Sequence, residues 1–281
     1  MNDVPHNRLM VIRNGELLPT DAPVIGITDP ALIQGHGLFE TIQAYQGRPF
    51  ALSEHLDRLE SGCRILGLAA PDRGSVDSMF QRIMEANGLL TATTCRLRIT
   101  IAAGRESPIE IYEATPSPLH PSTARIITGP FVRNERSLLS GIKTLSYGEN
   151  AVATQMTKEQ GATEAVWSNT KGELCEGTWS NVFVRVSGQW KTPPLDSGCL
   201  PGVTRAHLLS LSHDCGFEIE ESPIAFNLLS KVEAAFLTSS LREIQPVSHV
   251  DGRTLGKTAA QEIKLLQEAY ATSVAEAAQS S

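Results

Sequence analysis

The feature that most constrains the fold is a proline-rich stretch, EATPSPLHPSTAR, at residues 113–125. Proline locks φ and lacks a backbone N–H, so neither a central strand nor a helix tolerates this segment. At 281 residues the chain is also near the length at which single hydrophobic cores stop growing. Both observations predict two domains of mixed α/β structure: a smaller one over residues 1–132, a linker over 133–142, and a larger one over 143–281.

Composition narrows the class of ligand. The net charge is −7, which argues against a nucleic acid or an anionic membrane as the main partner. No window approaches the roughly 18 apolar residues that cross a bilayer, and the N-terminus lacks a signal-peptide core. We therefore expect a cytoplasmic protein that binds small molecules.

Several common sites are not expected from the motifs. The five cysteines are an odd number without C-x-x-C spacing, and the histidines show no metal-binding spacing, so neither a disulfide framework nor a metal site is predicted. GHGLF at residues 35–39 lacks the G-x-G-x-x-G spacing of dinucleotide binding. No G-x-S-x-G hydrolase motif occurs.

The first half reads as hairpins followed by helices. Asn14-Gly15 and Gln46-Gly47 predict tight turns between strands. Helical spacing of apolar residues predicts one helix from an N-cap at Ser53 to Gly67, and another over residues 75–87. Further strands are expected over residues 95–104, 109–115 and 124–132.

The second half alternates again between strands and helices. At least three short strands are expected within residues 165–194, with turns at residues 169–172 and 187–188. A further strand is expected over residues 234–240. Helices are predicted over residues 150–160, from Val203 onward, over 228–233 and over 257–271.

Glu176 stands out within GELCEGTWSNVFV, residues 172–184, which otherwise resembles a buried strand. An unpaired carboxylate there would cost several kcal/mol, so Glu176 requires a cationic or N–H partner. Two interpretations remain open. Glu176 is an edge-strand or bulge residue that faces water, which Gly177 would suit, or its carboxylate faces a pyridinium nitrogen and keeps that ring protonated.

Lys143 lies between Ile142 and Thr144-Leu145, directly after the expected linker. A partly desolvated lysine loses proton affinity and becomes an amine nucleophile that can form a Schiff base. The ordinary alternative is a lysine on the surface.

A candidate anion site lies at LPGVTR, residues 200–205, where a tight turn precedes a helix. Free N–H groups and the positive end of the helix dipole would converge on a phosphate there. Arg58 and the hydroxyls of Thr238, Ser239 and Ser240 could add donors. A Pro-Gly turn before a helix is common, however, and most helix arginines face solvent.

These features occur together in a familiar order. The chain resembles the class IV, fold-type IV pyridoxal-phosphate enzymes in the order and approximate spacing of five features. These are HLDRL, Lys143, ELCEGTWSNVF, TPPLDSGCLPGVTR and LTSSLREIQPV. The resemblance runs from about Asn14 to about Val247. It implies a D-amino-acid aminotransferase-like fold of two α/β domains, with pyridoxal 5′-phosphate between them, and a homodimer.

The resemblance implies a role for individual residues. Lys143 would form the aldimine with the cofactor and shuttle the proton, and Glu176 would pair with the pyridine nitrogen. The phosphate would be held by Arg58, Val203, Thr204 and Ser240, while Leu200 would pack against the ring. Tyr147 would bond the cofactor phenol oxygen; it follows Lys143 by four residues, as in the lyase and D-amino-acid branch, whereas branched-chain members have an interval of five.

The substrate side is less specified. Phe39, in HGLFETI, corresponds to the family strand that places a side chain in the substrate pocket. Arg96, Arg98 or Arg105 could bind a substrate carboxylate, and strand alternation puts Arg96 and Arg98 on one sheet face.

The predicted reaction is that of 4-amino-4-deoxychorismate lyase, giving 4-aminobenzoate and pyruvate for folate biosynthesis. Three segments are most similar to bacterial sequences of this lyase: NTKGELCEGTWSNVFV, SGCLPGVTR and LTSSLREIQPV. The alternative is a branched-chain or D-amino-acid aminotransferase that passes an amino group to a 2-oxo acid. D-amino-acid aminotransferases typically have Arg-Gly and a nearby His at the position where this chain has Ala103-Gly104-Arg105. This difference argues against the D-amino-acid alternative without excluding it. A third hypothesis is a non-catalytic binding protein that keeps the enzyme fold. The presence of both Lys143 and Glu176 argues against it.

Overall fold

The chain folds into two compact units. The computed structural model describes residues 9–279. One unit reaches to Pro118 and takes in Lys143–Ser146, and the other comprises Leu119–Ile142 and Tyr147–Gln279. This division differs from the expected one. Residues 119–132 and the expected linker, residues 133–142, belong to the second unit, whereas Lys143–Ser146 belong to the first. Residues 119–132 join the second unit because strand β7 (Ala124–Arg133) hydrogen-bonds to strands of its sheet.

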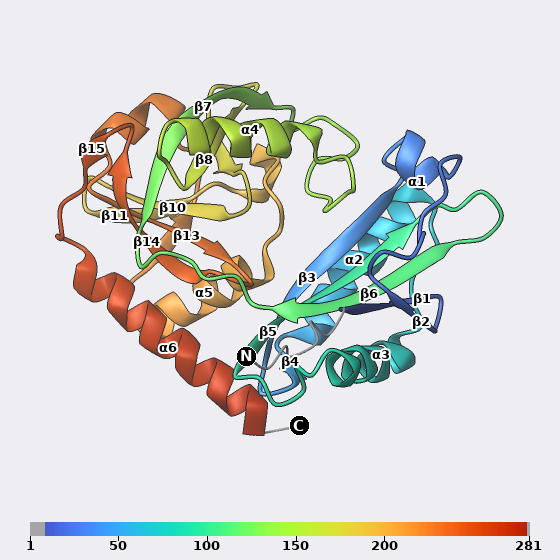
Figure 1. The fold of residues 1–281 in the computed structure, drawn as a ribbon. Coiled ribbons are helices and arrows are strands. Elements are labelled where there is room, and N and C mark those ends of the chain that lie inside the picture. The colour runs from blue at the N-terminus through green and yellow to red at the C-terminus, as the bar shows by residue number, and fades with distance from the viewer. Residues whose placement is uncertain (1–8, 280–281) are drawn as a thin grey trace, which may run out of the picture. The chain divides into compact units, whose positions relative to one another are not determined.

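The first unit is built on a six-stranded antiparallel sheet (Figure 1). Its strands lie in the order β2 (Glu16–Pro19), β1 (Met10–Arg13), β6 (Ile109–Pro116), β5 (Thr94–Ala102), β3 (Gly37–Tyr45) and β4 (Arg48–Pro49). Both predicted hairpin turns are confirmed, since Asn14 and Gly15 have φ of 47° and 81°, and Gln46 and Gly47 have φ of 50° and 76°. Positive φ at both central residues matches the twist of paired strands.

Helices α2 (Leu52–Leu66) and α3 (Arg73–Ala86) cover one face of this sheet, and the short α1 (Pro30–Ile33) precedes β3. Glu40 and Tyr112 share that face because both align with Ile99. Glu40 binds α2 side chains, and the Tyr112 ring packs on Phe80 of α3 with 5.3 Å between centroids. The opposite face carries the other strand positions, including Phe39.

The start of α2 corrects one prediction. Ser53 is not the N-cap: it lies inside the helix, whose N-cap is Ala51 in the left-handed region with φ of 53°. The chain enters the helix by a backbone turn, so no side-chain cap forms. The predicted end at Gly67 is confirmed, with φ of 67°. Helix α3 is capped by Asp72, which accepts a hydrogen bond from the Gly74 N–H.

The second unit contains a nine-stranded mixed sheet. Its order is β12 (Ile219–Glu221), β11 (Gln189–Thr192), β10 (Asn181–Val186), β13 (Ala234–Ser239), β14 (Glu243–Val250), β7, β8 (Glu164–Asn169) and β9 (Leu174–Gly177), with β15 (Arg253–Thr254) paired to β14. The pairs β11–β12, β14–β7 and β7–β8 are parallel, and the others are antiparallel. Strand β14 was not predicted, because Pro246 lies within it and proline normally excludes an internal strand.

Three α-helices and two 3₁₀ turns complete the described part of this unit: α4 (Gly148–Glu159), α5 (Val203–Asp214), α6 (Ala260–Gln279), η1 (Leu195–Ser197) and η2 (Phe226–Lys231). Helix α4 packs against β7 and β8, whereas α5 and α6 pack on each other and against β13 and β14 (Figure 1). Val182, Val184 and Leu237 lie fully buried in the largest apolar cluster described for this unit. Within residues 9–279, no helix has the length and apolarity needed to cross a membrane.

Candidate active site

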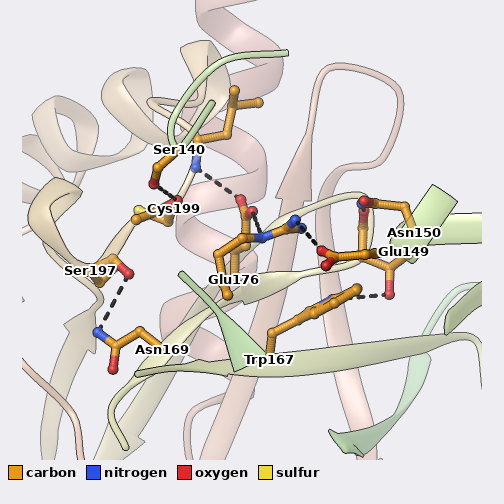
Figure 2. Close-up of polar contacts among 12 residues, drawn as sticks. Ser140, Glu149, Asn150, Trp167, Asn169, Glu176, Ser197 and Cys199 are labelled. Carbon is orange, nitrogen blue, oxygen red and sulfur yellow. Dashed lines mark hydrogen bonds and ion pairs between the residues drawn. The ribbon is translucent and has the colours of Figure 1, made fainter. Parts of the chain in front are cut away.

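Glu176 lies on β9, the edge strand next to β8, where the pairing register slips between Val166 and Ser168. The backbone therefore forms a bulge on an edge strand, as the first of the two interpretations of Glu176 expected. The side chain does not face water freely, because only 14% of it is exposed. Its Oε2 accepts the Leu200 N–H at 2.9 Å, and its Oε1 lies 3.4 Å from Arg133 Nε (Figure 2). The predicted requirement for a cationic or N–H partner is confirmed, since Glu176 has both.

The segment that leads to α5 is held at Leu200 through both backbone groups. While its N–H binds Glu176, its carbonyl accepts Asn181 Nδ2 at 2.8 Å. A Cβ on Gly202 would lie 2.0 Å from Asn181 Oδ1, so a side chain at this N-cap position would displace Asn181 from its hydrogen bond to Leu200. Gly202 supplies no side chain to cap α5, whose first turn holds the buried Val203 and Thr204. The start of this helix is therefore suited to an anion.

Two buried thiols flank these backbone segments. Burial raises the pKa of Cys199 to about 11, with a further rise from the Glu176 charge. Burial, followed by the Glu176 charge, also raises the pKa of Cys175. Both thiols are therefore neutral near pH 7 and add no charge beside Glu176.

Lys143 belongs to the first unit, where its segment pairs with the start of β3. The Phe39 N–H donates to the Lys143 carbonyl at 2.9 Å, and the Leu145 N–H donates to the Gly37 carbonyl at 2.8 Å. A Cβ on Gly37 would lie 2.6 Å from Leu145 Cδ1 and 2.8 Å from the Ile101 carbonyl oxygen, so only glycine allows this approach. Lys143 is half-buried, with Nζ 4.5 Å from the centroid of the Phe39 ring.

Arg96 and Arg98 share the sheet face of Phe39, as alternation predicted for the two arginines. Arg98 aligns with Thr41, two residues from Phe39, and its guanidinium carbon lies 3.7 Å from the Phe39 ring centroid. Arg98 Nε donates to Thr100 Oγ1 at 3.1 Å, and Arg96 Nε donates to Thr115 Oγ1 at 3.0 Å. Phe39, Lys143 and Arg98 therefore form one cluster on this face.

Arg58 has a carboxylate partner that the sequence did not predict. Its Nε and Nη2 donate to the two oxygens of Glu40 at 2.7 and 2.6 Å, and His55 Nδ1 lies 2.8 Å from Glu40 Oε2. Glu40 and His55 are 1% and 2% exposed. The expected phosphate role of Arg58 therefore rests on a guanidinium oriented by a buried acid.

Comparison with known proteins now decides the family. The family model described as amino-transferase class IV matches residues 37–250. The chain belongs to the class IV aminotransferase family. The match covers the strand of Phe39, Lys143, Glu176 and the start of α5.

Relatives in this family carry different activities. The chain is 28% identical over 276 residues to a putative branched-chain-amino-acid aminotransferase of Methanocaldococcus jannaschii, covering 93% of this chain and 95% of that protein. It is 26% identical to the aminodeoxychorismate lyase of Bacillus subtilis, covering 93% of each. The PLP-bound structure of a hypothetical aminotransferase from Mycobacterium tuberculosis superposes with a TM-score of 0.81 at 27% identity, covering 92% of this chain and 98% of that one.

The predicted fold-type IV architecture and cofactor class are thereby confirmed, and the class IV chain is a PLP-dependent enzyme. Each unit supplies residue types that suit the cofactor. The first unit has a half-buried amine against an aromatic ring. The second has a carboxylate held by a backbone N–H and an arginine cation, and a helix N-terminus without a side-chain cap. Within residues 9–279, no cluster of three or more His, Cys, Asp or Glu side chains could hold a metal ion.

Two further residues named for the cofactor lie in the second unit. Tyr147 is the N-cap residue of α4, and its ring lies 5.3 Å from that of Trp179. Ser240 is half-buried in the turn that follows β13. Each unit thus carries part of the predicted set: Phe39, Arg58, Arg96, Arg98 and Lys143 in the first, and Tyr147, Glu176, Leu200, Val203, Thr204 and Ser240 in the second.

Sequence reasoning missed Glu40, His55 and Arg133. The sequence does contain a signal for Glu40 and His55: His55 and Arg58 are three residues apart, so they share a helix face. A buried acid on the facing strand was the natural counterpart. Arg133 left none, because its position depends on the irregular register of β7.

Glu40 makes stability sensitive to acid. Burial raises its pKa, but the charge of Arg58 and hydrogen bonds from His55 and Arg58 outweigh this and lower it from the ordinary 4.5 to about 2. A carboxylate with a lowered folded pKa stabilises the fold above its unfolded pKa and loses that contribution as pH falls from 4.5 toward 2. By linkage the loss is about 2 kcal/mol at pH 3. Urea unfolding of the wild type and Glu40→Gln at pH 7 and pH 3 should show a larger fall for the wild type, and parallel falls would contradict this.

Proposed function

We propose that the enzyme is a 4-amino-4-deoxychorismate lyase that forms 4-aminobenzoate and pyruvate, a step toward folate. The carrying observation is the pair Arg96 and Arg98 on the face of Phe39 and Lys143. The lyase substrate has two carboxylates, one on its ring and one on its enolpyruvyl group, and guanidinium groups are the preferred partners of carboxylates. Similarity to the Bacillus subtilis lyase supports the same reaction.

We assign the residue roles by the family resemblance, and the local contacts of Lys143 and Glu176 support them. Pyridoxal phosphate supplies an electron sink when it is bound to the substrate amine. Lys143 would bind the cofactor covalently and act as the proton-transfer group. Glu176 would pair with the pyridine nitrogen, Tyr147 would bond the phenol oxygen, and Leu200 would pack against the ring. Arg58, Val203, Thr204 and Ser240 would hold the phosphate.

The proton balance assigns Lys143 two tasks. It removes the proton from the ring carbon that bears the amine, while the bond between the neighbouring carbon and the enolpyruvyl oxygen breaks. The electrons of the lost C–H bond complete the aromatic ring. The departing enolpyruvate takes up one proton and becomes pyruvate, so no oxidant or reductant is required. A half-buried lysine beside an aromatic ring is suited to both transfers.

Transamination is the second candidate, and the similarity to the putative Methanocaldococcus jannaschii branched-chain aminotransferase favours it. One arginine on the Phe39 face would bind the single carboxylate of a branched-chain substrate. In either case we propose a homodimer, as in the family resemblance, which light scattering after size exclusion tests.

The deciding assay supplies the cofactor-loaded enzyme with 4-amino-4-deoxychorismate. We expect equal amounts of pyruvate and 4-aminobenzoate. Arg98→Met should raise KM by about 10- to 100-fold, because one charge-assisted contact to a carboxylate is lost. Arg125→Met, which changes an exposed arginine on β7, is the matched control and should leave KM unchanged.

If neither product forms while amino groups pass from branched-chain or D-amino acids to 2-oxoglutarate, the lyase proposal is wrong and transamination replaces it. Product formation with an unchanged KM in Arg98→Met would leave the reaction but remove Arg98 from the substrate site.

A further inference from the structure

Arg133, at the end of β7, is a charged residue beside Glu176 to which no role has been assigned above. We propose that Arg133 is a positioning residue that orients the Glu176 carboxylate and holds it ionised, so that Glu176 keeps the cofactor nitrogen protonated. The inference rests on the proposed role of Glu176 and adds a residue that acts through it.

The guanidinium is held from several sides. Arg133 Nη1 lies 3.2 Å from Glu149 Oε2, and Nε lies 3.4 Å from Glu176 Oε1 (Figure 2). The guanidinium carbon is 4.6 Å from the ring centroid of Trp167, which is fully buried. Arg133 Nε is itself buried and makes no hydrogen bond, so its interaction with Glu176 is an ion pair.

The two oxygens of Glu176 therefore have different fixed partners. The Leu200 N–H holds Oε2, and the Arg133 cation faces Oε1. A cation at this distance favours the ionised carboxylate over the neutral acid. When a carboxylate binds a pyridinium, the proton stays on nitrogen only while the carboxylate is the weaker base. Removing Arg133 raises the basicity of Glu176 and favours transfer of that proton to the carboxylate.

An irregularity in β7 brings Arg133 to this position. Thr128 pairs with Val166, but Val132 pairs with Ser168. Between these two pairs β7 therefore advances four residues while β8 advances two. In an uninterrupted ladder Phe131 would lie beside Asn169, whereas the bulge places Arg133 there. Bulges commonly redirect side chains beside functional sites, and Gly129-Pro130 lies within this one.

The test compares purified variants that are loaded with ¹⁵N-labelled pyridoxal phosphate. The ¹⁵N chemical shift of the pyridine nitrogen reports its protonation, and a titration gives the cofactor Kd. In Arg133→Met, which keeps an apolar stem over Trp167, we expect the shift to move toward the unprotonated value and Kd to rise about tenfold. Arg133→Lys, which keeps the charge, should recover most of the protonated signal.

Two controls separate this role from a general effect of charge. Glu149→Gln removes the 65% exposed partner of Arg133 and leaves the contact with Glu176, so nitrogen shift and Kd should match wild type. Arg125→Met removes an exposed cation from the same strand and should also match it.

A protonated nitrogen and a Kd within about twofold of wild type in Arg133→Met would overturn the proposal, as would equal changes in Arg125→Met. If Arg133→Met does not fold, Arg133→Gln takes its place with the same expectations. If Arg133→Gln also fails to fold while Arg133→Lys binds as wild type, the residue serves stability and the proposal is wrong. An unprotonated nitrogen in the wild type would instead refute the proposed role of Glu176.

Discussion

Replacement of Lys143 by alanine is expected to abolish catalysis and the borohydride-fixed link to the cofactor. Its amine lies 4.5 Å from the Phe39 ring centroid, and its carbonyl accepts the Phe39 N–H, so the backbone fixes the start of the side chain. Loss of the proton-transfer group alone lowers turnover by about 10² to 10⁴-fold. Loss of the covalent link adds to this. Turnover and the mass of the reduced protein measure both effects.

Lys158→Ala is the matched control, because Lys158 is an exposed lysine on α4. It should retain both activity and the adduct. Peptide mapping that finds the reduced cofactor on another lysine, or an unchanged adduct in Lys143→Ala, would show that the lysine is wrongly assigned. Such a result would leave the family and fold intact, because these rest on the match over residues 37–250.

Replacement of Glu40 by leucine is expected to cost about 3–5 kcal/mol of unfolding free energy. The change leaves the buried imidazole of His55 and the 12% exposed guanidinium of Arg58 without their shared acceptor. Breaking one side of a buried pair is costly because the remaining charge stays desolvated. Urea unfolding at pH 7 measures the stability. Cofactor titration should also show weaker binding, because Arg58, the proposed phosphate ligand, loses the contacts with Glu40 that orient it.

The comparison variant is Asp57→Asn on the same helix. Asp57 binds Arg73 at 2.6 Å, but the two side chains are 64% and 42% exposed, so its loss should cost at most about 1 kcal/mol. Adding Arg58→Met to Glu40→Leu should recover part of the stability, because the cation that has lost the Glu40 carboxylate is removed as well. Equal unfolding midpoints for Glu40→Leu and Asp57→Asn would contradict the importance of the buried pair.

The candidate site was predictable where its signal is local. Lys143, Glu176 and the LPGVTR turn were predicted as site residues from short motifs and from the family resemblance that these motifs carry together, and the structure gives Glu176 the partners it required. The orientation of Arg58 was not predictable, because its partner Glu40 lies on β3 and no local pattern pairs the two. The predicted domain boundary was also wrong because of long-range pairing: β7 joins a sheet whose other strands come later in the chain.

The sequence by itself determined the hairpin turns, the ends of helices at glycine, the α/β class and the motifs of the family. These depend on φ preferences, apolar periodicity and short spacings, which act between residues close in the chain. Only the tertiary structure decided that Ala51 begins α2, that β7 belongs to the second sheet, and that Glu40 and Arg133 support Arg58 and Glu176. Such contacts depend on strand register and burial, because a carboxylate without water must find its partner wherever the fold places one.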